Sequence, residues 1–342
     1  MIVMAHCTDV TRRSLLKWTT VAAGSGLLAS SRRFESAAQE PFITLITGPS
    51  HDSFWFTIEC GVHAAALELG LLVDPRYPQQ FDATEQASLL ADAVLEGPSA
   101  ILVAPADRTA MIEPIRAAAS SGIPIVTVDT IIDEPLAIAE VGSDNVLGGQ
   151  MAVWALAELT GGTGSVFLST TRPGISTTDD RQSGFEQALA SYDFVSIGVE
   201  YNNNDASLAR EQIDAVLDQH PDLTAIVATN LNGSLGAAEA ILDRDMQGQV
   251  AVIGFDAGPT LVSALEQGIV SALIAQHPYD MGYSATYIAA DFVHSGITPG
   301  QRQFTTDYSV VTAGNVDDPI IRRILYVEDC AEIPELAATP TA

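Results

Sequence analysis

Residues 123–129 read Ile-Pro-Ile-Val-Thr-Val-Asp, and this stretch decides the fold class. Its β-branched run favours a strand, and the lack of a polar alternation is typical of a strand covered on both faces. The preceding Gly122 and Pro124 belong to a turn that separates the strand from a helical pattern. The strand ends on a charged residue, Asp129, which makes its carboxyl end chemically distinctive.

The same arrangement of strand and helix extends in both directions along the chain. The predicted strands are Phe42–Thr47, Leu71–Asp74, Ala100–Ala104, Ile125–Asp129, Ala137–Val141, Ser165–Ser169, Val195–Glu200, Ala225–Thr229, Val250–Phe255, Ser271–Ala275 and a final one near Thr305–Val311. The predicted helices are Ser53–Leu69, Ala83–Glu96, Thr109–Ser120, Leu147–Thr160, Asp180–Ala190, Ser207–Asp218, Ser234–Asp243, Pro259–Gln267 and Tyr279–Val293. Regular alternation predicts an α/β fold with mostly parallel strands, and this number of strands favours two doubly wound lobes over one very wide sheet.

The first 38 residues are typical of an export signal. Thr11-Arg12-Arg13-Ser14-Leu15-Leu16-Lys17 is a twin-arginine run, a weakly apolar stretch follows, and Ser36-Ala37-Ala38 offers the small residues of a cleavage site. The alternative is an ordinary basic amphipathic N-terminus. The apolar stretch is too short for a membrane span, so we expect residues 1–38 to be a signal peptide and the mature chain to be periplasmic or extracellular, without membrane insertion.

The charge of the chain opposes binding to nucleic acid or to an anionic membrane. The formal net charge is −28, and removing residues 1–38 takes away five basic and two acidic residues, which gives −28 − 5 + 2 = −31. Lys17 is the one lysine, so the mature chain has none. A cluster of basic residues that could neutralise phosphates is therefore absent from the composition. An ordinary solvated acidic surface accounts for such a charge, and adaptation to a salty or hot habitat is an alternative explanation.

The cysteines and histidines indicate neither a metal site nor a nucleophile. Cys7 would leave with the signal, while Cys60 and Cys330 could pair in an oxidising compartment. Because Cys60 lies in a helical pattern and Cys330 near the end of the chain, the sequence favours two free thiols. The histidines lack metal-ligand spacing, and Gly161-Gly162-Thr163-Gly164 precedes its strand, which is typical of a turn rather than a nucleotide loop. We expect no cofactor.

Polar residues follow several predicted strands at the point where each strand ends. In open parallel sheets, ligands bind at the carboxyl ends of the strands, so these residues predict one polar cleft. They are Asp52, Asp129, Asn230, Asp256 and Gln276. Phe54 and Trp55, beside Asp52, could stack on an apolar ring face or be ordinary core aromatics. Arg181, at the start of a predicted helix, could face the cleft or the solvent.

Two chemistries fit these strand-end carboxylates. Asp129 and Asp256 could act as the acid and base of a glycoside hydrolase, or they could accept hydrogen bonds from sugar hydroxyls. The sequence has no G-x-S-x-G motif, so it lacks the nucleophile elbow of a serine hydrolase.

From Pro41 to about Asp307 the chain resembles periplasmic sugar-binding proteins of the ribose-binding type, which are subunits of ABC importers. The motifs that carry the resemblance are Asp52-Ser53-Phe54-Trp55, residues 123–129, Val141-Gly142-Ser143-Asp144-Asn145-Val146-Leu147-Gly148-Gly149, Arg181-Gln182-Ser183-Gly184-Phe185, Thr229-Asn230, Val252-Ile253-Gly254-Phe255-Asp256 and Ile274-Ala275-Gln276. The resemblance implies that Phe54 and Trp55 form an aromatic wall. It also implies that Asp52, Asp129, Arg181, Asn230, Asp256 and Gln276 bind sugar hydroxyls.

Three positions depart from the ribose-binding pattern. Thr130 follows Asp129 where the ribose binder has an arginine, Asn204 falls where an aromatic residue would cover the second sugar face, and Ser53 replaces a proline. The ligand could therefore be ribose, another aldose, a polyol or a cyclitol, with Thr130 and Asn204 among its contacts.

The resemblance also implies a domain organisation and a function. Residues 41–143 and 277–305 would form the N-terminal lobe and residues 144–276 and 306–330 the C-terminal lobe, joined by a three-stranded hinge near residues 143, 276 and 306. Residues 331–342 would be a flexible tail. We expect a monomeric solute-binding subunit that delivers a monosaccharide or polyol to the membrane permease of an ABC importer, not an enzyme. Alternatives are a sensory binding protein that presents its closed form to a membrane receptor and, less favoured, a secreted glycoside hydrolase.

Overall fold

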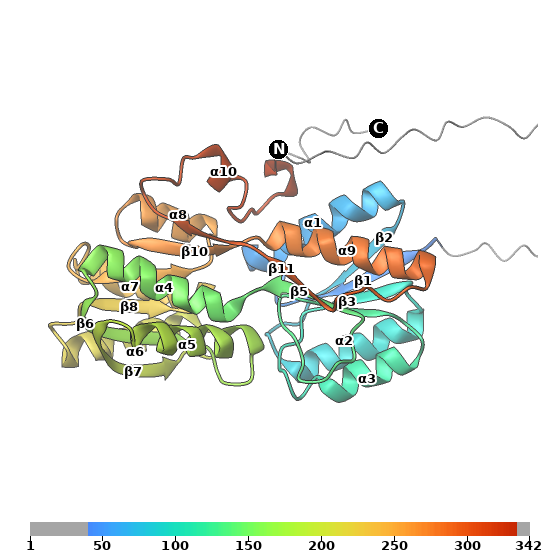
Figure 1. The fold of residues 1–342 in the computed structure, drawn as a ribbon, viewed down its shortest axis with the longest axis horizontal. Helices are drawn as coiled ribbons and strands as arrows, with labels where there is room; N and C mark the ends of the chain where they lie inside the picture. Colours follow the sequence, from blue (N-terminus) through green and yellow to red (C-terminus); the bar gives the residue numbers. More distant parts are fainter. Residues whose placement is uncertain (1–39, 334–342) are drawn as a thin grey trace, which may run out of the picture. The chain divides into compact units, whose positions relative to one another are not determined.

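The structure, a computed structural model, describes residues 40–333. The expected signal peptide, residues 1–38, and residues 334–342 of the expected tail lie outside the described residues. The described part contains two six-stranded sheets, each covered by helices, and this confirms the predicted fold class (Figure 1). Each sheet with its helices is called a lobe below.

The first sheet has the strand order β11-β5-β4-β3-β1-β2, and all its strand pairs are parallel. Its strands are β1 (Phe42–Ile46), β2 (Leu72–Arg76), β3 (Ala100–Val103), β4 (Ile125–Val128), β5 (Ala139–Ser143) and β11 (Gln303–Thr306). The central strands β1, β3 and β4 are buried throughout, as a sheet with helices on both faces requires. Helices α1 (Ser53–Leu69) and α9 (Pro278–Ser295) pack together on one side, and α2 (Ala83–Glu96) and α3 (Ile112–Ser120) on the other (Figure 1).

The second sheet has the order β12-β10-β9-β8-β6-β7, with β12 antiparallel to β10 and the other pairs parallel. Its strands are β6 (Thr163–Thr170), β7 (Asp193–Tyr201), β8 (Ala225–Ala228), β9 (Ala251–Phe255), β10 (Ala272–Gln276) and β12 (Tyr308–Val311). Its helices are α4 (Asn145–Thr160), α5 (Ser176–Leu189), α6 (Ala206–Gln219), α7 (Leu231–Asp243) and α8 (Pro259–Glu266). The pairs α4 with α5 and α6 with α7 pack closely.

The chain passes between the two sheets at three neighbouring places. It leaves the first sheet after Ser143, returns to it after Gln276, and crosses again between Thr306 and Tyr308. Ser143 pairs with Thr306 in the first sheet, and Gln276 pairs with Tyr308 in the second. Because Thr306 and Tyr308 are separated by one residue, the three crossings lie close together. The single final strand expected near 305–311 is therefore wrong: it is two short strands in different sheets, separated by Asp307.

The C-terminal residues pack back onto the first lobe. After the short helix α10 (Pro319–Arg322), the chain forms a 3-10 helix, η1 (Cys330–Glu332), and Ile333 is buried. A disulfide joins Cys330 to Cys60 of α1, with the two Cα atoms 5.4 Å apart. The expectation of two free thiols is wrong, because the chain after β12 folds back and brings Cys330 against the buried face of α1, where Cys60 lies. Residues 331–333 of the expected tail also belong to this packed segment.

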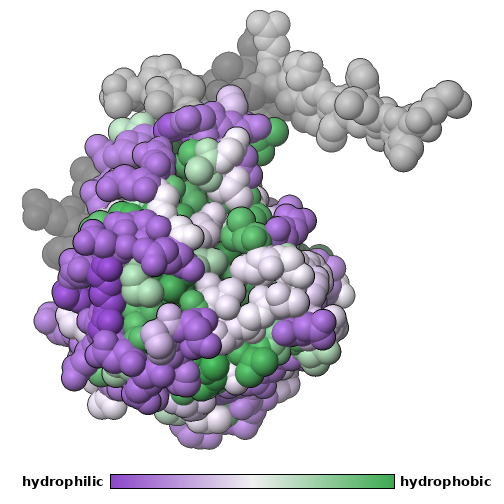
Figure 2. Space-filling view, turned by 90° about the vertical axis from the view of Figure 1, so that its left-hand side faces the viewer, coloured by the Kyte–Doolittle hydropathy of each residue, from purple (hydrophilic) through white to green (hydrophobic). Residues whose placement is uncertain are grey.

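Hydrophilic residues line one side of the face that Figure 2 displays, while hydrophobic and neutral residues are interspersed over its middle (Figure 2). The large hydrophobic side chains that are exposed on the second lobe include Trp154 and Leu159 of α4 and Val195 of β7. Among residues 40–333, no helix is both long and apolar enough to cross a membrane.

Candidate functional site

The carboxyl ends of strands from both sheets converge on one narrow pocket. The volume open to the centre of a water-sized molecule is about 60 Å³. All ten residues predicted as site residues line it: Asp52, Phe54, Trp55, Asp129, Thr130, Arg181, Asn204, Asn230, Asp256 and Gln276. Phe81, Thr171, Ile175, Thr177, Thr178 and Leu231 complete the lining. The first lobe contributes Asp52 to Thr130 and the second lobe the rest, so the pocket lies between the lobes.

Two of the strand-end aspartates adopt an uncommon backbone conformation. Asp129 follows β4 with φ 63° and Asp256 follows β9 with φ 74°, both in the left-handed region. Aspartate tolerates this region better than most residues because its short side chain can satisfy the local backbone. The positive φ turns each carboxylate out of its strand and into the pocket rather than onto a sheet face. Both residues are buried.

Close packing of α4 against α5 fixes the position of Arg181. A Cβ atom at Gly149 would collide with the carbonyl of Arg181, and one at Gly184 would collide with the carbonyl of Val146. The guanidinium donates to Asn145 Oδ1 at 2.9 Å and to the carbonyl of Thr229 at 2.8 Å. It also lies 4.5 Å above the ring of Phe255, a cation–π distance.

Arg181 lies in the second turn of its helix, since α5 begins at Ser176. The expectation that Arg181 opens a helix is therefore wrong. The first turn, Ser-Thr-Thr, consists of residues with modest helix propensity, and no side chain caps it. The sequence pattern is consequently weak where the helix begins.

A chain of amides forms another wall of the pocket. Asn230 donates to Asn204 Oδ1 at 2.8 Å and accepts from Asn202 Nδ2 at 3.2 Å. Asn204, in the left-handed region at φ 63°, is also held by Asn232, which donates to its carbonyl at 3.0 Å. This network holds the side chains of Asn204 and Asn230 in place before any ligand arrives.

Aromatic side chains from the first lobe close one side of the pocket. Asp52 caps α1 by accepting from the N–H of Phe54 at 2.9 Å, which fixes the start of the helix that carries Phe54 and Trp55. The rings of Phe54 and Trp55 meet edge to face at 4.9 Å, and Phe81 stacks on Trp55 at 5.2 Å. Gly48 lets the indole approach closely, since a Cβ there would overlap the Trp55 ring. The result is a rigid apolar wall.

Three buried polar atoms in this pocket have no hydrogen-bond partner. They are Asp129 Oδ1, Thr130 Oγ1 and Gln276 Oε1. Buried polar atoms are nearly always paired, because an unpaired one costs roughly 1–3 kcal/mol. Their convergence on one small cavity indicates that a ligand or water supplies the missing partners.

Burial also perturbs the carboxyl groups. It raises the pKa of Asp129 to about 7, since Arg181 compensates only partly and Asp256 and Asp52 add repulsion. Burial likewise raises the pKa of Asp52 to about 7, against the lowering effect of the Phe54 N–H. Burial opposes the charge of Arg181, but Tyr308, Asp256 and Asp129 outweigh it and raise the pKa of the guanidinium. The site therefore contains one fixed cation and carboxyl groups that titrate near neutrality.

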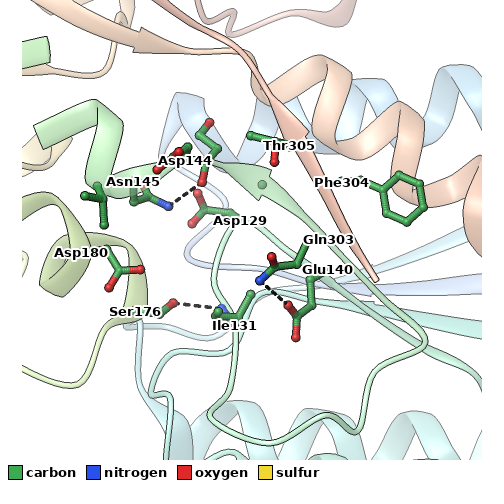
Figure 3. A pocket seen from close by; sticks show the side chains of 13 residues that line it. Asp129, Ile131, Glu140, Asp144, Asn145, Ser176, Asp180, Gln303, Phe304 and Thr305 are labelled. Carbon is green, nitrogen blue, oxygen red and sulfur yellow. Dashed lines mark hydrogen bonds between the residues drawn. The ribbon is translucent and has the colours of Figure 1, made fainter. Parts of the chain in front are cut away.

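A second, larger cavity shares Asp129 with the pocket (Figure 3). It lies beside the crossing strands β5 and β11, with about 280 Å³ open to the centre of a water-sized molecule. Asp144, Asn145 and Asp180 line it, and the Ser176 hydroxyl accepts from the N–H of Ile131 at 2.9 Å. This cavity is larger than the pocket. Of the three residues whose buried polar atoms lack a hydrogen-bond partner in the pocket, however, Asp129 is the one that lines it. Among residues 40–333, no group of His, Cys, Asp and Glu is placed to hold a metal ion.

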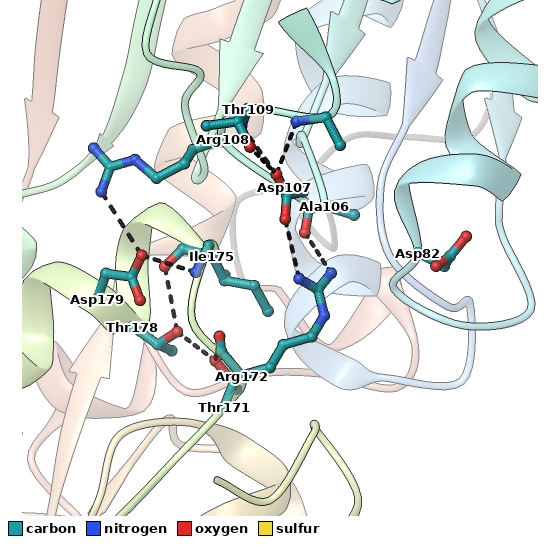
Figure 4. A network of polar contacts seen from close by, with 12 residues as sticks. Asp82, Ala106, Asp107, Arg108, Thr109, Thr171, Arg172, Ile175, Thr178 and Asp179 are labelled. Atoms are coloured by element: carbon teal, nitrogen blue, oxygen red, sulfur yellow. Dashed lines mark hydrogen bonds and ion pairs between the residues drawn. The ribbon is translucent and has the colours of Figure 1, made fainter.

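Polar contacts join the lobes at the rim of the pocket (Figure 4). Arg172, after β6, donates to Asp107 Oδ2 at 3.2 Å and to the carbonyl of Ala106 at 3.0 Å. The backbone N–H of Arg108 donates to the carbonyl of Gly174 at 2.8 Å, and the Arg108 guanidinium lies 3.8 Å from the Asp179 carboxylate. We call residues 106–108 and 172–179 the latch. It holds the lobes together over the pocket.

Comparison with known proteins assigns the family. A model described as the periplasmic binding protein domain matches residues 43–296. This chain belongs to the periplasmic binding protein family. Among curated relatives, the ribose import binding protein RbsB of Bacillus subtilis (strain 168) is 30% identical over 255 residues, which are 74% of this chain and 81% of that protein.

Solved structures of the family show the same fold. An ABC transporter solute binding protein from Agrobacterium vitis, bound with alpha-D-tagatopyranose, is 34% identical with a TM-score of 0.82, and covers 84% of this chain and 100% of its own. A carbohydrate transporter solute binding protein from Agrobacterium radiobacter, in complex with D-arabinose, is 27% identical with a TM-score of 0.80 and the same coverage.

Sequence reasoning missed several residues of this periplasmic binding protein's pocket. Phe81 lies in the loop before α2, and Thr177 and Thr178 lie in the first turn of α5. None of these three follows a strand directly, so the rule that located the strand-end residues could not reach them; Thr171, which follows β6 directly, was within its reach and was still missed. The uncapped, Thr-rich start of α5 was the one available signal.

Proposed function

We propose that this protein is the extracytoplasmic solute-binding subunit of an ABC importer and binds a monosaccharide or related polyol in the pocket between the lobes. The carrying observation is the set of buried, unpartnered atoms of Asp129, Thr130 and Gln276 beside an aromatic wall. A sugar ring matches both features. Its hydroxyls donate and accept hydrogen bonds, while its C–H face packs on aromatic rings.

The charges of the site fit a neutral, hydroxyl-rich ligand. Asp52, Asp129 and Asp256 together bring more potential negative charge than Arg181 balances, which opposes an anionic sugar phosphate. An ionised carboxylate accepts strong hydrogen bonds from hydroxyls, and the five-donor guanidinium serves ring and hydroxyl oxygens. The narrowness of the pocket favours a ligand of one ring over an oligosaccharide.

The departures from the ribose-binding pattern bear on the choice of sugar. Thr130 and Asn204 line the pocket where the ribose binder has an arginine and an aromatic residue. The second sugar face would therefore meet amide groups of Asn204 and Asn230 rather than a ring. A hydroxyl or hydroxymethyl group on that face suits such a wall better than bare C–H groups do, so we expect a ligand other than ribose to bind most tightly.

The sequence motifs and the resemblance to ribose-type binding proteins support the remaining elements of the proposal. Residues 1–38 direct export through a twin-arginine signal, and the mature chain acts as a monomer outside the cytoplasm. The lobes, 41–143 with 277–305 and 144–276 with 306–330, open and close at the crossings near residues 143, 276 and 306. The closed form is presented to a membrane permease. The protein performs no catalysis.

A thermal-shift screen of the mature chain against pentoses, hexoses, deoxyhexoses, polyols and inositols tests the proposal. A ligand at about 1,000 times its Kd stabilises the folded state by roughly 4 kcal/mol, which raises the Tm by roughly 8–16 °C. Calorimetry then measures the affinity of each hit. The proposal is wrong if no member of the panel raises the Tm, or if the Asp256→Ala variant binds the best hit as tightly as the parent does.

A further inference from the structure

The chain beyond α10 connects the pocket to the first lobe. We call residues 324–333 the C-terminal strap. Tyr326 of the strap is buried, and its hydroxyl donates to Asp256 Oδ1 at 2.9 Å while accepting from the N–H of Gln276 at 3.2 Å. The N–H of Tyr326 donates to the carbonyl of Ala257 at 3.1 Å. Tyr326 thus contacts the ends of two adjacent strands, β9 and β10, at the residues that face the pocket.

The other end of the strap is fastened to α1. The N–H of Val327 donates to Thr57 Oγ1 at 3.0 Å, and Cys330 forms the disulfide with Cys60. Val327, Cys60 and Ile333 share one buried cluster. Helix α1 begins at the pocket, so the strap joins the aromatic wall of the first lobe to Asp256 of the second. The Tyr326 ring lies 5.6 Å from the ring of Phe54.

Both hydrogen bonds that Asp256 receives reach the same oxygen. Gln276 Nε2 donates to Oδ1 at 3.0 Å and the Tyr326 hydroxyl donates to it at 2.9 Å. Within residues 40–333, no further hydrogen bond to this carboxylate is present, so Oδ2 stays available. Two donors on one oxygen fix the rotation of the carboxylate and decide where Oδ2 points.

Tyr326 itself does not line the pocket. Burial and the neighbouring Asp256 carboxylate raise the pKa of the Tyr326 hydroxyl well above 10, so it remains a donor at any physiological pH. A buried phenylalanine at this position would fill the same space and keep the contact with Phe54. The hydroxyl therefore has a role that packing does not explain.

We propose that Tyr326 is a positioning residue for ligand binding: its hydroxyl orients Asp256 toward a sugar hydroxyl, and the disulfide-anchored strap holds Tyr326 in place. This inference rests on the proposed function. It predicts that the affinity for sugar depends on two features outside the pocket. These are the hydroxyl of Tyr326 and the redox state of Cys60 and Cys330.

The Tyr326→Phe variant tests the first dependence. Losing one hydrogen bond to a charged group should raise the Kd for the best sugar of the panel about 10-fold, because Gln276 Nε2 is then the one donor among residues 40–333 that still holds Asp256 Oδ1. The Tyr283→Phe variant is the matched control. It also removes a tyrosine hydroxyl that donates to a carboxylate, Glu68 Oε2 at 3.0 Å, but on the exposed side of α9. Its Kd should equal that of the parent.

A double-mutant cycle separates positioning from a general structural effect. If Tyr326 acts through Asp256, then Tyr326→Phe should cost about 10-fold in the parent and much less in an Asp256→Asn background. Equal costs in both backgrounds would overturn the inference, since the hydroxyl would then act independently of Asp256. A Tyr326→Phe variant with the parent's Kd would overturn it as well.

Reduction tests the second dependence. Dithiothreitol transfers two electrons and two protons to the disulfide, which gives two thiols and the oxidised cyclic form of the reagent. Calorimetry with the reduced parent, its free thiols counted, should give a Kd several-fold higher than with the oxidised parent. Reduction of the Tyr326→Phe variant should change its Kd little. An unchanged Kd for the reduced parent would overturn the anchoring role of the disulfide.

The outcomes also distinguish the inference from the proposed function. If the parent binds a sugar and Tyr326→Phe binds it equally well, the inference fails and the proposed function stands. If the parent binds no member of the panel, the proposed function fails and the inference falls with it.

Discussion

Replacing Asp129 with asparagine should make the unliganded protein more stable and weaken its binding of sugar. Asp129 is 7% exposed, and its Oδ1 atom is buried without a partner. Asparagine has nearly the same shape and tolerates the left-handed backbone at φ 63°, whereas alanine there would add roughly 1–2 kcal/mol of backbone cost. The substitution therefore removes the charge and leaves the backbone as it is.

The magnitude follows from the raised pKa. A carboxyl group with a pKa of about 7 in the folded state and 3.8 in the unfolded state destabilises the fold by about 4 kcal/mol at alkaline pH. Stability falls as pH rises from about 4 through 7, because the folded state holds a proton that the unfolded state has released. Below pH 4 both states are protonated and the effect vanishes.

Asp129→Asn removes this destabilisation, but part of the recovered stability is lost because the amide is itself polar and buried. The expected net stabilisation of the variant is about 2 kcal/mol at pH 8. That corresponds to an increase in Tm of roughly 4–8 °C. The affinity should fall about 10- to 150-fold, the equivalent of a hydrogen bond to a charged group worth roughly 1.5–3 kcal/mol.

Thermal melts of the unliganded protein from pH 4 to 8, with calorimetry for the best sugar of the panel, measure both effects. Asp245→Asn is the matched control, since Asp245 also adopts a left-handed backbone, at φ 53°, but is exposed. Its melting curve should match that of the parent at every pH. An Asp129→Asn variant no more stable than the parent at pH 8, or with unchanged affinity, would refute the reasoning.

Three further predictions concern the same site. Sugar binding near pH 7 should release protons, because hydroxyl donors favour the ionised forms of Asp52 and Asp129, each with a pKa of about 7. The calorimetric enthalpy of binding should then vary with the ionisation enthalpy of the buffer at pH 7 and be independent of the buffer at pH 9. Arg172→Gln, which removes both latch bonds of that side chain, should raise the Kd about 3- to 10-fold and increase the radius of gyration of the unliganded protein in solution scattering. Sugar should change the tryptophan fluorescence through Trp55, which is 7% exposed, and not through Trp154, which is 44% exposed; a response retained in Trp55→Phe and lost in Trp154→Phe would contradict this.

The strand-end residues could be predicted because their signal is local. A buried apolar run such as Ile125–Val128 ends within one residue of Asp129, and parallel strands bring such ends to one edge. The same reasoning located Asp256 after β9 and Gln276 at the end of β10. All of these side chains line the pocket, although the roles assigned to them stay predictions.

The rest depends on contacts between distant segments. Phe81 reaches the pocket by stacking on Trp55, and Tyr326 reaches Asp256 from 70 residues further along the chain. Neither residue lies in a periodic pattern. The disulfide has the same origin, because a sequence separation of 270 residues between Cys60 and Cys330 carries no information on their distance.

The junction of β11 and β12 restricts how the halves of this molecule can move. A single residue, Asp307, separates a strand of one sheet from a strand of the other, and the hydroxyls of Ser143 and Thr306 lie 3.2 Å apart beside it. A link of one residue permits rotation of one lobe relative to the other but almost no translation between them. In the proposed opening and closing of the lobes, atoms beside this junction would therefore shift the least.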